Sequence, residues 1–120
     1  MTTSPVMKLL MRRIEAKGHS LTLKDNVLTL DNGVAFTYIE GAEVNHFEIT
    51  YEDTFVTIVA GKGTYLTAAI AVIRECIDSI CTNMMESQQL AYYTAASLQA
   101  AITEHDLRSR ERTRAMMDFL

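Results

Sequence analysis

The clearest hydrophobic pattern in the chain is a stripe of apolar residues at steps of three and four between Gly63 and Glu86. An α-helix has 3.6 residues per turn, so it places such positions on one side. Small residues flank the stripe and widen it beyond about 100°, which is broader than a coiled-coil seam. We therefore predict one long helix over 64–86 that packs on the protein's own sheet. Its stripe consists of Leu66, Ile70, Ile73, Ile77, Ile80 and Met84.

The pattern before this helix predicts a first helix and then a sheet. Ser4 and Pro5 are typical of a helix start and Gly18 of a helix end, which predicts a helix over 5–17. Across 20–60 apolar and polar residues alternate with a period of two, which indicates β-strands. The connections are short, so we predict an antiparallel β-meander of four to five strands with one buried face.

The last predicted strand, over 54–60, carries apolar side chains on both faces. Phe55 and Val59 lie on one side of it, and Val56 and Ile58 lie on the other. A strand with two apolar faces is normally covered on both. We therefore predict that this strand is central in the sheet or that a partner covers its second face.

The stretch from Ser87 to Thr103 contains no formal charge and is rich in alanine. It predicts a helix over 87–104 that is covered on several sides, either by the chain itself or by a second subunit. Asp106 is a suitable N-cap for a final helix over 106–118. We predict a homodimer from the uncharged helix. The predicted dimer contacts are Ala91, Tyr92, Ala95, Leu98 and Ile102.

These elements predict a single compact α+β domain over 1–120. It has two layers: an N-terminal helix, the antiparallel sheet, and two to three C-terminal helices packed on one sheet face. The 120 residues are 48% hydrophobic and 22% charged, which is ordinary for a globular domain with a real core.

Several features predict a cytoplasmic protein. No apolar run reaches the roughly 18 residues that a membrane span requires, and Met1 to Arg13 lacks the uncharged core of a secretory signal. Cys76 and Cys81 lie about 140° apart on one predicted helix, so they cannot bridge each other and are expected to be free thiols.

The net charge of −4 is unevenly distributed, because residues 25–61 hold seven acidic residues and no lysine or arginine. An acidic sheet face can dock on a basic surface, including that of a nucleic-acid-binding protein. We predict two partner-binding groups from the charges. The acidic group is Glu40, Glu43, Glu48, Glu52 and Asp53, and the basic group on the last helix is Arg108, Arg110, Arg112 and Arg114.

The turn of Gly61, Lys62, Gly63 and Thr64 stands between a predicted strand and a predicted helix. A helix N-terminus with a lysine favours anions, so this turn is an alternative site for a small anionic ligand or nucleotide. A Walker loop needs a further glycine upstream, and Tyr51 to Ala60 contains none. Two glycines also suit an ordinary strand-to-helix turn.

No catalytic constellation is recognisable in the sequence, and no set of residues has the spacing of metal ligands. We therefore predict a non-enzymatic protein without a cofactor or metal. Its function is that of a small interaction protein, an inhibitor or adaptor, which binds another protein through the acidic sheet face or the terminal helix. A second alternative is nucleic-acid binding through basic helix faces. Those faces carry Lys8, Arg12, Arg13 and the C-terminal arginines.

The topology from Pro5 to Tyr51, a helix followed by a meander, resembles the dimeric chaperones of bacterial type III secretion. Beyond this segment the predicted elements differ from that family, which inserts a helix between its third and fourth strands. The whole arrangement also resembles compact inhibitors that phages encode. These resemblances imply a protein-binding role and assign no residue.

Overall fold

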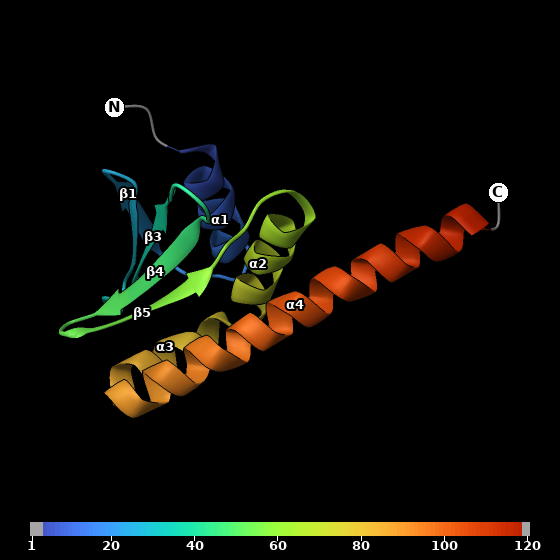
Figure 1. Cartoon of the computed structure of the whole chain (residues 1–120). Helices are drawn as coiled ribbons and strands as arrows, with labels where there is room; N and C mark the ends of the chain where they lie inside the picture. The colour runs from blue at the N-terminus through green and yellow to red at the C-terminus, as the bar shows by residue number, and fades with distance from the viewer. Residues whose placement is uncertain (1–3, 119–120) are drawn as a thin grey trace.

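The computed structural model describes residues 4–118 and contains four helices and five strands (Figure 1). The elements are α1 (Pro5–Glu15), β1 (Leu21–Lys24), β2 (Val27–Leu30), β3 (Ala35–Ile39), β4 (His46–Tyr51), β5 (Thr54–Val59), α2 (Gly63–Glu75), α3 (Ile77–Glu86) and α4 (Gln88–Asp118). The predicted α+β architecture is confirmed: one helix, an antiparallel sheet of five strands, and three C-terminal helices.

The sheet follows the chain order β1-β2-β3-β4-β5, and each strand is antiparallel to its neighbours. The register aligns Leu28, Phe36, Ile49 and Val56 in one row across the sheet. All four side chains are buried and share one core with the helices. The adjacent row, on the opposite and open face, consists of Lys24, Val27, Thr37, Glu48 and Thr57.

Strand β5 is an edge strand, which corrects the prediction of a central position. Val56 and Ile58 point into the core, whereas Phe55 is 59% exposed on the other face. The Gln99 side chain of α4 protects part of the free edge. The Val59 N–H donates to Gln99 Oε1 at 2.7 Å, and Gln99 Nε2 donates to the Val59 carbonyl at 3.2 Å. At Val59 the side-chain amide of Gln99 thus makes the two hydrogen bonds that a neighbouring sixth strand would make.

The predicted helix over 64–86 is two helices, because the chain bends at Cys76 (φ −100°, ψ 10°). The Cys76 N–H still bonds to the Val72 carbonyl, and the Cys76 carbonyl accepts from the Ile80 N–H. The bend therefore costs little backbone hydrogen bonding. Ile73 and Ile77, on its two sides, are both fully buried, so the apolar stripe continues through the break.

The two predicted helices over 87–104 and 106–118 form one helix of 31 residues, α4. Asp106 does not cap a new helix. It lies within α4, is 5% exposed, and pairs with Arg110 one turn later (Oδ2 to Nε, 3.2 Å). Figure 1 shows α4 running beside β5 and then leaving the body of the molecule. We call residues 107–118 the projecting end of α4, and every one of them is exposed.

The helices of residues 4–118 include none that is long and apolar enough to cross a lipid bilayer.

Candidate binding surface across α2 and the end of α4

Three neighbouring hollows cross the outer surface of α2. The first, of about 240 Å³, lies between α1 and α2, and the second, of about 400 Å³, lies between the start of α2 and α4. The third, of about 320 Å³, lies beside the projecting end of α4. Thr67 lines the first two, while Thr64 and Ser109 line the last two. The hollows therefore adjoin, and we call them together the basic trough.

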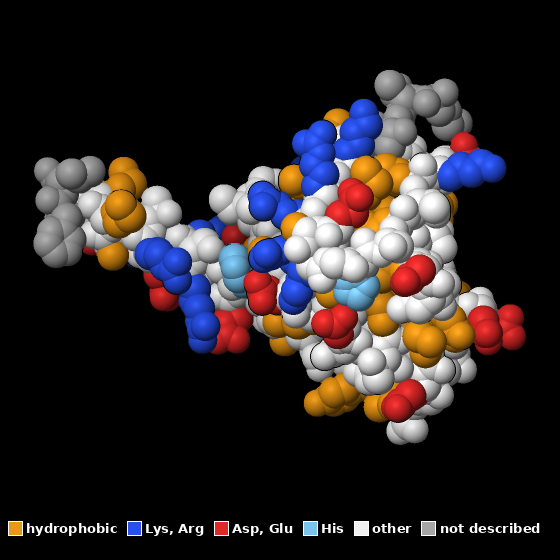
Figure 2. Space-filling view, turned by 180° about the vertical axis from the view of Figure 1, so that it is seen from behind, with side chains coloured by type: hydrophobic (Ala, Val, Ile, Leu, Met, Phe, Trp, Pro, Cys, Tyr) orange, Lys and Arg blue, Asp and Glu red, His pale blue; other side chains and the backbone are white. Residues whose placement is uncertain are grey.

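The charged side chains of the basic trough all have the same sign. Arg13 and Arg74 line the first hollow, and Arg110 and Arg114 line the third. His105 lies between them in the second hollow, and no aspartate or glutamate lines any of the three. In Figure 2 the Lys and Arg side chains gather mainly in a band over the helices that continues along the projecting end. A surface of this kind attracts anionic groups.

The arginines of the basic trough differ in how far their charge is already compensated. Arg110 pairs with the buried Asp106 and also donates from Nη2 to Thr64 Oγ1 at 3.5 Å, so it links α4 to α2. Arg74 makes a long contact of 3.4 Å with Glu75, and its buried Nε has no hydrogen-bond acceptor among the described residues. The ion pairs within residues 4–118 do not include Arg13 or Arg114.

The predicted anion turn contributes only part of its residues to the basic trough. Gly63 and Thr64 line it, whereas Lys62 is exposed outside the lining. Lys62 is the N-cap of α2 and makes no side-chain capping bond. Gly61 has a structural role, because its φ is +68° and a Cβ there would come within 2.8 Å of the Tyr65 ring. An anion bound at the start of α2 would therefore lie closer to the arginines of α4 than to Lys62.

The four C-terminal arginines lie on two different sides of α4. Residues four apart lie on the same side of a helix, whereas residues two apart lie on nearly opposite sides. Arg110 and Arg114 therefore line the basic trough together. Arg108 and Arg112 lie on the other side, where Arg108 Nη2 donates to Glu104 Oε1 at 2.6 Å. Only half of the predicted basic group belongs to this surface.

The predicted acidic group does not form one patch. Glu40 and Glu43 lie in the loop before β4, whereas Glu52 and Asp53 lie in the turn after it. A strand of six residues separates these ends by about 20 Å. Only Glu48 lies on the open sheet face between them, and it is half-buried.

Three of the predicted dimer contacts have no surface to offer a second copy. Ala91, Leu98 and Ile102 are buried in the core of this chain, and Ala95 packs against the same core. Tyr92 alone of the five has more than half of its surface exposed, at 56%. One side of the uncharged stretch of α4 packs against α2, α3 and β5, while Tyr92, Tyr93, Ala96, Ser97 and Ala100 on its other side are exposed.

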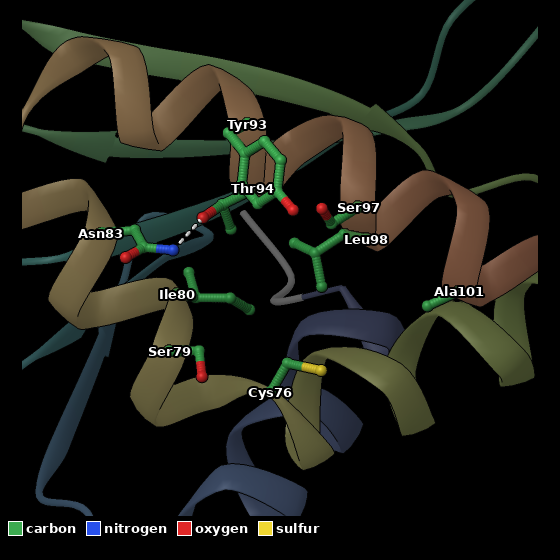
Figure 3. Close-up of a pocket in the computed structure, with 9 residues that line it drawn as sticks. All are labelled: Cys76, Ser79, Ile80, Asn83, Tyr93, Thr94, Ser97, Leu98 and Ala101. Carbon is green, nitrogen blue, oxygen red and sulfur yellow. Dashed lines mark hydrogen bonds between the residues drawn. The ribbon is translucent and has the colours of Figure 1, made fainter.

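A separate hollow of about 290 Å³ lies between α3 and α4 (Figure 3). Its lining contains no charged residue and combines Ile80 and Leu98 with the hydroxyl groups of Ser79, Thr94 and Ser97 and the Cys76 thiol. Asn83 Nδ2 donates to Thr94 Oγ1 at 2.6 Å across it. Two of the polar groups of this hollow, those of Asn83 and Thr94, are thus already paired with each other. Nothing in the sequence pattern predicts this hollow.

Within residues 4–118 no group of three His, Cys, Asp or Glu side chains is arranged to hold a metal ion. The chain matches no protein-family model, and neither a curated protein nor a solved structure is significantly similar to it.

Proposed function

We propose that the chain is a non-enzymatic interaction protein that binds another macromolecule through the basic trough and the projecting end of α4. The observation that carries the proposal is the exposure of the last three turns of α4. Leu107, Met116 and Met117 are 54%, 68% and 69% exposed there, whereas one side of α4 before residue 107 packs on the body of the molecule.

A helix that extends alone into solvent gains no stability from tertiary packing, and a segment of about 12 residues is marginal by itself. Apolar side chains on such a helix are typical of one that docks against another surface. Methionine suits this role because its flexible side chain adapts to an irregular partner surface. The two methionines stand at the far end of the helix, beyond the arginines of the basic trough.

The buried Asp106 favours a macromolecular partner over a small anion at the start of α2. Its carboxylate pairs with Arg110, which also contacts Thr64, so the charge of the arginine at this helix N-terminus is already compensated. A nucleotide phosphate bound there would have to compete with Asp106 for Arg110. Thermal-shift measurements with nucleotides test the alternative: a stabilisation that Lys62→Ala removes would favour a ligand site.

The proposal is tested by capture from a lysate of the organism that encodes the chain, with quantitative mass spectrometry of the retained proteins. The bait Arg13→Gln with Arg114→Gln removes two charges of the basic trough that form no ion pair among residues 4–118. The matched bait Lys17→Gln with Lys24→Gln removes two exposed charges outside both the basic trough and the projecting end of α4. We expect the first pair to lose a retained protein that the wild type and the second pair keep. Equal retention by all three baits would contradict the proposal.

A further inference from the structure

We infer that the partner offers an acidic peptide segment with an apolar side chain, which the α1–α2 end of the basic trough receives. This inference rests on the proposed function and names the chemistry of the partner. The site is the first hollow, which contains two arginines from different helices around apolar side chains. Its lining is Leu9, Arg13, Thr67, Ile70, Ala71 and Arg74.

The Arg74 guanidinium carries the strongest sign of a missing partner. Its Nε is covered and has no acceptor among the described residues, and its one ion pair within residues 4–118 is the 3.4 Å contact of Nη1 with Glu75. The side chain is nevertheless 40% exposed, so its charge reaches the surface beside the hollow. A carboxylate entering the hollow would pair with the exposed part of this guanidinium, whose planar geometry it matches.

The apolar part of the hollow indicates what lies next to that carboxylate. Leu9 is 39% exposed on α1, on the rim of the hollow that Ile70 and Ala71 of α2 complete. A side chain such as leucine can bury its surface here while a neighbouring carboxylate reaches Arg13 or Arg74. The combination fits a segment in which acidic and apolar residues alternate over short distances.

The same observations disfavour a nucleic acid. The lining of the basic trough contains no phenylalanine, tyrosine or tryptophan, so the His105 ring is its single group on which a base could stack. The chain carries a net charge of −4, which repels a polyanion at long range. A short peptide with a few carboxylates carries less negative charge than a nucleic acid, so the same net charge repels it less.

The inference is tested by nuclear magnetic resonance titration of the labelled full chain with a blocked peptide of Glu-Glu-Leu repeats. We expect shifts at the amides of Leu9, Thr67 and Ala71. Replacing both arginines, Arg13→Gln with Arg74→Gln, should weaken binding by about tenfold or more. The matched pair Lys17→Gln with Lys24→Gln, at exposed positions outside the lining of the hollow, should bind as the wild type does. Arg13→Gln alone should also weaken binding. Because the Arg13 side chain is exposed, this variant should fold normally, so its weaker binding cannot be attributed to a folding defect caused by replacing Arg74.

The inference is overturned if the peptide causes no shifts in the basic trough, or if a Gln-Gln-Leu peptide binds as tightly as the Glu-Glu-Leu peptide. It is also overturned if an oligothymidylate binds the basic trough more tightly than the peptide does. A fourth contradicting result is self-association of the chain that the Arg13 and Arg74 replacements abolish. The last result would make a second copy the occupant. If the peptide fails while capture still depends on Arg13 and Arg114, the partner chemistry is wrong and the proposed function stands. If capture is also independent of these arginines, both fail.

Discussion

At the scale of single residues, Gln99 links three elements through one side chain. It satisfies the N–H and carbonyl of Val59 on the edge of β5, and its Nε2 also donates to the Tyr65 hydroxyl at 2.9 Å. The Tyr65 hydroxyl in turn lies 3.0 Å from Thr103 Oγ1. The network therefore fixes α4 against both β5 and α2. It also occupies the edge position at which another strand could pair.

Replacing Gln99 by alanine should lower the free energy of unfolding by about 1–3 kcal/mol, because the Val59 N–H loses its acceptor. The matched variant Gln89→Ala alters an exposed glutamine of the same helix and should change stability by less than about 0.5 kcal/mol. Urea denaturation measures both. Equal stabilities of the two variants would show that the edge contact contributes nothing.

The two thiols should differ in reactivity. Burial raises the pKa of the Cys81 thiol, with a smaller raising effect from Asp78 and Asp31, against a lowering effect of the Asn32 side chain. Its thiolate is therefore scarce near pH 8, and its reaction with Ellman's reagent should be slow and should accelerate at higher pH. Cys76 lines the hollow between α3 and α4 and should react first. Simultaneous reaction of both thiols in the folded protein would contradict the structure.

The same shift predicts how stability depends on pH. The Cys81 thiol ionises in the unfolded chain near its ordinary pKa of 9.0 but only at higher pH in the folded chain. The contribution of this thiol to stability is therefore constant below pH 9 and is lost as the pH rises above it. Comparison of the wild type with Cys81→Ala over pH 8–10 isolates the effect. A difference between the two that does not change with pH would contradict it.

At the scale of elements, the apolar stripe correctly predicts which residues are buried but does not predict the bend at Cys76. The bend preserves the spacing of the stripe, so the sequence pattern is the same for one helix or two. Conversely, Asp106 as an N-cap predicts the start of a new helix where α4 continues without a break. The change from uncharged to charged residues near position 104 marks the place where α4 leaves the body, because charged residues suit the exposed end.

The body and the projecting end should respond differently to the loss of apolar side chains. Ile73→Ala removes a fully buried side chain and should lower the free energy of unfolding by about 2–5 kcal/mol. Leu107→Ala, at an exposed position of α4, should change it by less than about 0.5 kcal/mol. Denaturation curves of both variants decide this. A large loss from Leu107→Ala would mean that the projecting end packs on the body.

At the scale of the whole molecule, the basic trough is assembled from α1, α2 and α4, which are far apart in the sequence. The period of the first helix identifies Arg13 as facing away from the core, and the cluster of arginines near the end of the chain is evident. The pairing of these groups with Arg74 and His105 depends on how the helices cross. No local spacing encodes that crossing, so the fold class was predictable from sequence and the candidate surface was not.

The acidic residues show the opposite relation between sequence and space: they are close together in the sequence but far apart in the structure. Their density between residues 25 and 61 predicts one acidic face, but a meander alternates its turns between the two ends of the sheet. Glu40 and Glu43 consequently lie far from Glu52 and Asp53. The acidic residues that are concentrated in one segment of the chain are therefore dispersed in space. The arginines of the basic trough, which are scattered along the chain, lie together.

Hydrogen–deuterium exchange on the chain alone and in complex with a protein captured from the organism that encodes it tests the proposed contact most directly. The contact comprises the basic trough and the projecting end of α4, so we expect new protection within residues 9–13, 63–74 and 105–117. We expect unchanged exchange in the turns that contain Glu43 and Asp53. Protection confined to β4, β5 and those turns would contradict the proposed contact and would assign it to the acidic sheet.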